Sequence, residues 1–154
     1  MSDAQPTFGI EKIYVKDLSL EVPGGPQAFM QSEPPQLEVQ LTQQSQRINE
    51  LLFEVTLVVT VTAKTGDKTL FLVEASQAGV FQIRNVPESD LGPVLGVVCP
   101  NVLFPYAREA VSDLVSRAGF PPVLLAPVNF EAIYQQRAAE AAAKPGGPRI
   151  EVAH

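Results

Sequence analysis

The residue types that most often perform covalent catalysis or bind metals are scarce in this chain of 154 residues. It contains one cysteine, Cys99, and one histidine, His154, which stands at the last position. A single cysteine forms neither an intrachain disulfide nor a cysteine-based zinc site, and one terminal histidine is a poor basis for a Ser-His-Asp triad. We therefore expect no metal site, no cofactor and no catalytic residues, and we predict that the protein is not an enzyme.

Short motifs with a known chemical role are absent or incomplete. The stretch Gly66–Thr69 is similar to the end of a phosphate-binding loop, but no glycine stands five residues before it, so a turn is the better interpretation. Asp17 and Glu21 would share one face of a strand about 13 Å apart, too far for joint acid–base catalysis but suited to a charged docking surface. Cys99 precedes a proline within an apolar run, which favours a buried, unreactive thiol over a reactive one.

Acidic residues are concentrated in the first third of the chain. The sequence has 17 acidic and 11 basic residues, for a net charge of −6, and residues 1–54 hold eight of the acids but three of the bases. An acidic surface repels phosphate backbones, so we expect no nucleic-acid binding. The charge is compatible either with an ordinary solvated face or with a surface that attracts a basic partner.

The sequence predicts a cytoplasmic protein that does not insert into membranes. The first residues, MSDAQPTFGIEKI, lack the basic segment and the apolar segment of a signal peptide. No apolar run approaches the roughly 20 residues that a membrane-spanning helix needs. The single cysteine agrees with a reducing compartment.

Alternating apolar residues predict strands in the first half of the chain. From Phe8 they occupy every second position, but the phase of the alternation changes twice, after position 10 and after position 15. A long strand with bulges or bends would give this pattern. Further strands are predicted at residues 37–41, 51–64 and 69–75, and the turn at 64–68 is short enough to join antiparallel neighbours.

The second half has the spacing of helices. One apolar face is formed by Ala107, Val111, Leu114, Val115 and Ala118, and Gly119 is a suitable C-cap. Upstream, Pro100 and Pro105 imply either a helix start or a kink. A second helix is predicted to begin near Asn129, a good N-cap.

Strands followed by helices indicate the α+β class, in one domain at residues 8–143 with mobile ends at 1–7 and 144–154. Apolar residues remain beyond what a one-sided sheet needs, because Phe71, Val73 and Ala75 alternate with Leu70 and Leu72. This surplus predicts self-association.

Large apolar side chains also occur in two places outside the strands. Phe29 and Met30 lie in a proline-rich connection, and Phe130, Ile133 and Tyr134 lie on the last predicted helix. They could be ordinary core residues. They could also form a groove with adaptable walls that accepts apolar side chains of other proteins.

Three stretches closely resemble the SecB family of protein-export chaperones. They are GVVCPNVLFPYAREAVSDLVSRAGFPPVLLAPVNFEAIY at residues 96–134, IYVKDLSLEVP at residues 13–23 and FLVEASQAGVF at residues 71–81. The resemblance covers the chain from about Phe8 to Tyr134. It implies an ATP-independent holdase that binds unfolded secretory precursors in the cytoplasm and delivers them to the SecA motor. It also implies a four-stranded antiparallel Greek-key sheet with helices packed on one face, assembled as a homotetramer that is a dimer of dimers.

The resemblance also implies roles for particular residues. Positions that dock the zinc-carrying C-terminal tail of SecA match Asp17, Glu21, Leu72 and Glu74. Client-binding positions match Phe29, Val39, Leu41, Phe130, Ile133 and Tyr134, and Met30 joins them because of its adaptable side chain. Positions at the dimer interface match Val73, Ala75 and Gln77, and the helix that joins the dimers matches residues 100–118.

The chain departs from the family pattern in the proline-rich connection. Family members often have a tryptophan where this chain has Glu33, followed by Pro34 and Pro35. An alternative function is that of a SecB-like chaperone dedicated to a single partner, such as a toxin–antitoxin system. Such a chaperone would not need the residues that match the SecA-docking positions, so their presence favours the export chaperone.

Overall fold

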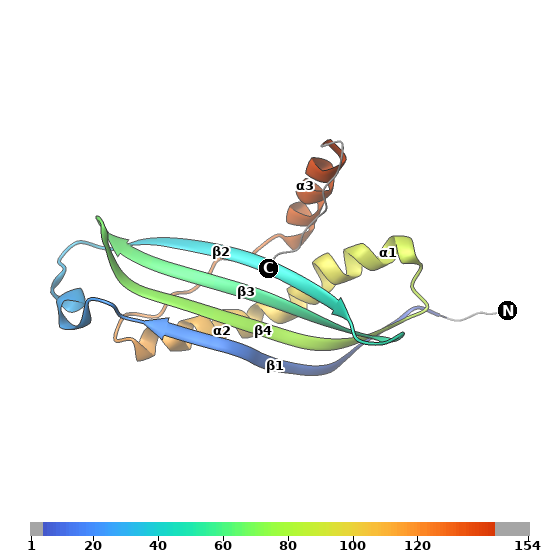
Figure 1. Ribbon diagram of the computed structural model, residues 1–154, viewed down its shortest axis with the longest axis horizontal. Coiled ribbons are helices and arrows are strands. Elements are labelled where there is room, and N and C mark those ends of the chain that lie inside the picture. The colour runs from blue at the N-terminus through green and yellow to red at the C-terminus, as the bar shows by residue number, and fades with distance from the viewer. Residues whose placement is uncertain (1–4, 144–154) are drawn as a thin grey trace.

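The computed structural model describes residues 5–143 and contains one sheet with helices on one side (Figure 1). The strands are β1 (Thr7–Glu21), β2 (Gln36–Arg47), β3 (Leu52–Thr65) and β4 (Lys68–Arg84). The helical segments are η1 (Gly25–Met30), α1 (Glu88–Pro93), η2 (Val94–Val98), α2 (Cys99–Arg117) and α3 (Phe130–Ala143). This arrangement confirms the predicted α+β class.

The strand order is β1-β4-β3-β2, and all neighbouring strands are antiparallel. Strands β2, β3 and β4 follow one another through short turns, including a two-residue turn in which Gly66 has a φ of 61°. The connection that contains η1 carries the chain from β1 at one edge of the sheet to β2 at the other. Both β1 and β2 are therefore edge strands.

The two faces of the sheet differ sharply in composition. On the helix side, β3 and β4 contribute an apolar row that packs against α2; it includes Val55, Leu57, Val59, Val61, Phe71, Val73 and Phe81, all buried. On the opposite side, which we call the outer face, the same strands carry Glu54, Thr60 and Glu74. Figure 1 shows α2 along the sheet and α3 extending away from it.

Two bulges explain why the apolar phase of β1 changes twice. The pairing of β1 with β4 shifts register between Ile10 and Lys12 and again between Val15 and Asp17. Each extra residue moves every later side chain to the other face of the sheet. The predicted bulges are thus confirmed, and the apolar residues of β1 all face the helix side.

The long helix begins earlier than the proline positions indicated. Segments α1, η2 and α2 follow one another without a break from Glu88 to Arg117, and Pro100 and Pro105 both lie within α2. Pro100 stands at the first positions of α2, as a helix start there predicts, but α1 and η2 continue the helical path upstream to Glu88, and Pro105 lies inside α2. The π-helical segment η2 stands just before Pro100, where the proline cannot donate a backbone hydrogen bond.

The predicted helix caps are confirmed. Gly119 has a φ of 93° and donates to the carbonyl of Ser116, while Phe120 donates to that of Val115, which is the Schellman pattern. The side chain of Asn129 accepts a hydrogen bond from the backbone N–H of Ala132 and so caps α3.

The predicted mobile ends fall mostly on residues that are not described. The segments 1–4 and 144–154, including His154, lie outside the described residues. Of the predicted N-terminal segment 1–7, the last residue, Thr7, already begins β1.

Candidate functional site

The four residues that match the SecA-docking positions come together on the outer face, where β1 pairs with β4. Glu21 lies directly opposite Leu72, Ser19 lies opposite Glu74, and Asp17 is two residues further along the same face. Both β1 carboxylates are exposed. The hydroxyl of Thr60 donates to Glu74 Oε1 over 2.9 Å and so orients this carboxylate. We call Asp17, Glu21, Leu72 and Glu74 the docking strip.

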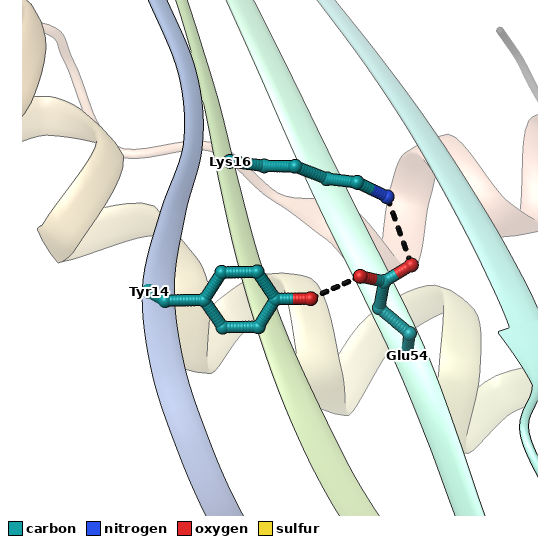
Figure 2. Close-up of polar contacts among 3 residues, drawn as sticks. All are labelled: Tyr14, Lys16 and Glu54. Carbon is teal, nitrogen blue, oxygen red and sulfur yellow. Dashed lines mark hydrogen bonds and ion pairs between the residues drawn. The ribbon is translucent and has the colours of Figure 1, made fainter.

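A second polar cluster lies beside the docking strip and joins β1 to β3 across β4. Figure 2 shows the ring of Tyr14 on β1 reaching across β4 toward Glu54 on β3. The Tyr14 hydroxyl donates to one oxygen of Glu54, and Lys16 Nζ lies 3.0 Å from the other. The ring crosses β4 at Ala78, which lies opposite Tyr14 and whose methyl group is too small to obstruct the ring.

The cluster shifts the ionisation of both acidic groups. Burial raises the pKa of Tyr14 to about 12, and the hydrogen bond to Glu54 and that carboxylate's charge act in the same direction. Burial also raises the pKa of Glu54, but hydrogen bonds from Tyr14 and Lys16, with the Lys16 charge, outweigh it and leave this pKa below its ordinary value. At neutral pH Tyr14 is therefore a neutral phenol and Glu54 is a carboxylate.

The cluster was not predicted from the sequence. Glu54 is separated by 40 residues from Tyr14 and by 38 from Lys16, so no local spacing brings them together. The signal that could have found it is the second change of phase in β1, which places Tyr14 and the bulged Lys16 next to each other on the outer face.

On the helix side, a groove of about 540 Å³ lies at the end of the sheet next to η1. Its apolar walls include Phe29, Leu37, Leu70, Phe71, Phe120 and Leu124, and Glu33 and Pro35 stand at its border. Three of the rings pack in series: Phe120 stacks on Phe29 with 4.9 Å between ring centres and lies tilted against Phe71 with 5.0 Å between ring centres. We call this space the crossover groove.

Leu70 reaches the crossover groove because of a third bulge. The pairing of β3 with β4 shifts register between Ala63 and Lys64, which leaves Leu70 as the extra residue. The sequence pattern placed Leu70 on the same face as Leu72. In the structure Leu70 is buried and lines the crossover groove with Phe71, whereas Leu72 remains on the outer face.

A smaller pocket of about 190 Å³ lies between β2, the long helix and α3. Its lining includes Gln43, Leu95, Gly96, Tyr134 and Arg137. We call it the α3 pocket.

A row of side chains on the helix side of β2 connects the two spaces. The row consists of Leu37, Val39, Leu41 and Gln43, which pair with buried residues of β3. Leu37 lines the crossover groove and Gln43 lines the α3 pocket, about 20 Å apart at the usual strand rise. Val39 is 46% exposed, because the packing of α2 is directed at β3 and β4 rather than at this edge strand.

The residues expected to bind clients divide into three groups. Phe29 and Tyr134 line the crossover groove and the α3 pocket, and Val39 and Leu41 lie on the row between them. Met30 is 75% exposed and is not part of the groove wall.

The last group is buried. Phe130 is 2% exposed and packs edge-on against Phe104 in the core, and Ile133 is partly buried against the same core. The structure therefore places Phe130 beneath the surface rather than on an open wall.

The residues expected at the dimer interface also lie inside this chain. Val73, Ala75 and Gln77 sit on the helix side of β4, and none is more than 3% exposed. They offer no free surface in the single chain, and their role at an interface remains a prediction.

Cys99 is fully buried, as predicted, and burial raises the pKa of its thiol to about 12. Within residues 5–143, no group of three or more histidine, cysteine or acidic residues is placed to hold a metal ion. Over the same residues, no helix has the length and apolar character needed to span a membrane.

The amino-acid sequence of nearly all the described residues matches a known family. Residues 1–141 match the family described as preprotein translocase subunit SecB. The chain belongs to the SecB family. It is 63% identical over 140 residues to the protein-export protein SecB of Chromobacterium violaceum, an alignment that covers 91% of this chain and 93% of that one. It is 60% identical over 147 residues to the protein of the same name from Dechloromonas aromatica, covering 96% and 97% of the two chains.

A solved structure has the same fold at low sequence identity. It is the SecB-like chaperone of Mycobacterium tuberculosis in complex with a ChAD peptide from the HigA1 antitoxin, with a TM-score of 0.64 and 17% identity. The match covers 79% of this chain and 90% of that one. It supports the SecB fold for the sheet and helices described above.

Proposed function

We propose that this SecB-family protein is an ATP-independent holdase chaperone that binds unfolded secretory precursors and delivers them to the SecA motor for export. The observation that carries the proposal is the placement of two different surfaces on the two sides of one sheet. An apolar groove lies on the helix side, and the docking strip lies on the outer face. A chaperone that transfers clients to a motor needs to contact both at the same time.

The helix side suits segments of unfolded chains. The crossover groove offers stacked aromatic rings, and the row on β2 extends it with partly exposed apolar side chains. Apolar walls of this kind bind many sequences because the hydrophobic effect has no direction. Several such grooves in one oligomer would bind one client by avidity. None of this requires a catalytic residue, which supports the prediction that the protein is not an enzyme.

The outer face suits a compact basic or metal-carrying partner. Asp17 and Glu21 are exposed carboxylates, Leu72 lies opposite Glu21, and Thr60 orients Glu74. This combination of charge with one apolar contact supports docking of the zinc-carrying C-terminal tail of SecA. Electrostatic complementarity would give the contact its specificity and rate more than its total affinity.

The protein is also proposed to act in the cytoplasm as a homotetramer, a dimer of dimers, with the Greek-key arrangement of its family. The strand order β1-β4-β3-β2 supports that arrangement. Edge strand β1 has four partly exposed apolar side chains on the helix side, namely Phe8, Ile10, Val15 and Leu18. An apolar stripe of this kind on an edge strand supports burial against a second copy.

Binding of a permanently unfolded polypeptide tests the proposal. The oligomer is expected to bind it at micromolar concentration without nucleotide, and a natively folded form of the same polypeptide serves as control. If the oligomer bound neither form, the chaperone function would be wrong. A protein that bound only one client sequence, with no affinity for the SecA tail, would instead be a chaperone dedicated to one partner.

A further inference from the structure

Gln77 is a polar residue in an otherwise apolar row. Its neighbours on the helix side of β4 include Val73, Ala75 and Phe81, and its own side chain is 3% exposed. Burying a carboxamide is unfavourable unless it is hydrogen-bonded. Gln77 Nε2 donates to the carbonyl oxygen of Tyr14 over 3.1 Å, so the side chain is tied to the backbone of β1.

This hydrogen bond lies at the second bulge of β1. Val15 is opposite Gln77, and the register shift follows immediately, between Val15 and Asp17. Ladder hydrogen bonds are disrupted at a bulge, so a side-chain donor from the neighbouring strand can fix the local path of the backbone. The Gln77 carboxamide therefore lies at the point where the side chains of β1 switch faces.

The bulge decides which residues form the docking strip. Side chains alternate between faces along a strand, so removing the extra residue would reverse the faces of everything after it. Asp17 and Glu21 would then turn to the helix side, and Leu18 would turn to the outer face. The position of the strip therefore depends on a backbone feature that its own side chains do not contact.

We propose that Gln77 is a positioning residue for the docking strip. Its hydrogen bond to Tyr14 holds the bulge at Lys16, and the bulge keeps Asp17 and Glu21 on the outer face beside Leu72 and Glu74. Gln77 acts from the opposite face of the sheet. Its effect on docking rests on the proposed function, whereas its effect on the bulge does not.

The variant Gln77→Met tests this role, because methionine keeps the length of the side chain and removes the donor. Amide hydrogen exchange at residues 14–18 should become about tenfold faster, while that of β3 stays unchanged. Binding of the SecA tail peptide should weaken about fivefold, and binding of an unfolded polypeptide should not change. The matched control, Gln82→Met, removes the same carboxamide from the outer face of β4 and should change neither quantity.

Several outcomes separate positioning from general stability. Equal acceleration of exchange throughout the sheet, or none in β1, would overturn the proposal. If the variant failed to fold, the wild-type protein still provides a test: the side-chain amide protons of Gln77 should exchange slowly in NMR spectra, and rapid exchange would contradict the hydrogen bond. Local acceleration in a protein that never binds the tail would support the role at the bulge and contradict the proposed docking.

Discussion

The ring of Tyr134 on α3 lies directly against Gly96 of η2. A Cβ atom at Gly96 would meet Tyr134 Cδ1 at 2.7 Å, and one at Gly92 would meet the phenol oxygen at 2.5 Å. Two glycines four residues apart thus form a notch for one aromatic side chain. Because η2 is the main contact of α3, this notch fixes where α3 stands beside β2 and gives the α3 pocket its shape.

Gly96→Ala is expected to lower the free energy of unfolding by about 1 kcal/mol, because the new methyl group overlaps the ring. Glycine to alanine within a helix ordinarily stabilises by about 1 kcal/mol, so the sign is diagnostic. In a Tyr134→Ala background the same change should be stabilising. Denaturant unfolding of the four proteins measures both effects, and equal stabilisation in the two backgrounds would contradict the contact.

Glu74→Lys is expected to weaken binding of the SecA tail about tenfold, because it reverses a charge that Thr60 holds in place on the docking strip. Binding of an unfolded polypeptide should be unchanged. The control is Glu38→Lys, which makes the same charge change on the outer face of edge strand β2, away from the strip. Titration calorimetry measures the affinity of both variants for the SecA tail, and an equal loss of affinity in both would indicate a general effect of charge.

Phe29→Ala is expected to weaken binding of an unfolded polypeptide about fivefold, because the ring forms a wall of the crossover groove. Its neighbour Met30 is more exposed and outside the groove wall, so Met30→Ala should have a smaller effect. Fluorescence anisotropy with a labelled unfolded polypeptide measures both. A larger loss of affinity in the Met30 variant would show that clients bind outside the crossover groove.

The Tyr14–Glu54 contact predicts a stability change at high pH. The folded-state pKa of Tyr14 is raised from 10.0 to about 12, so its contribution is complete below pH 10 and is lost as the pH rises through 12. Spectrophotometric titration should show Tyr14 ionising at an unusually high pH among the three tyrosines. Tyr14→Phe should remove that step and reduce stability at neutral pH by about 1 kcal/mol. A titration in which no tyrosine ionises above pH 11 would contradict the contact.

The features that the sequence could predict depend on the types and spacing of neighbouring residues. The two changes of apolar phase in β1 predicted its bulges, and Asn129 and Gly119 predicted the helix ends where the structure has them. The docking strip was reached by resemblance, and the bulge at Lys16 supplies its physical basis. These signals concern neighbouring residues, whose geometry depends little on the rest of the chain.

The features that the sequence could not predict depend on contacts between distant residues. Gly79 lies within β4, and a Cβ atom there would approach Ile13 on β1 to 3.2 Å as well as the Phe81 ring to 2.9 Å. The sequence left Phe130 open between a core residue and a groove wall, and its packing against Phe104 in the core decides between them. The cluster of Tyr14, Lys16 and Glu54 joins strands that are not adjacent in the sheet.

The most direct measurement is the affinity of the intact oligomer for a permanently unfolded precursor, with and without a saturating amount of SecA tail peptide. Because the groove and the docking strip lie on opposite sides of the sheet, the precursor should bind at micromolar concentration or tighter. Its dissociation constant should change by less than about twofold when the peptide is present, as expected for two separate sites without coupling. Absence of precursor binding, or displacement of the precursor by the peptide, would contradict a chaperone that holds its client and its motor at the same time.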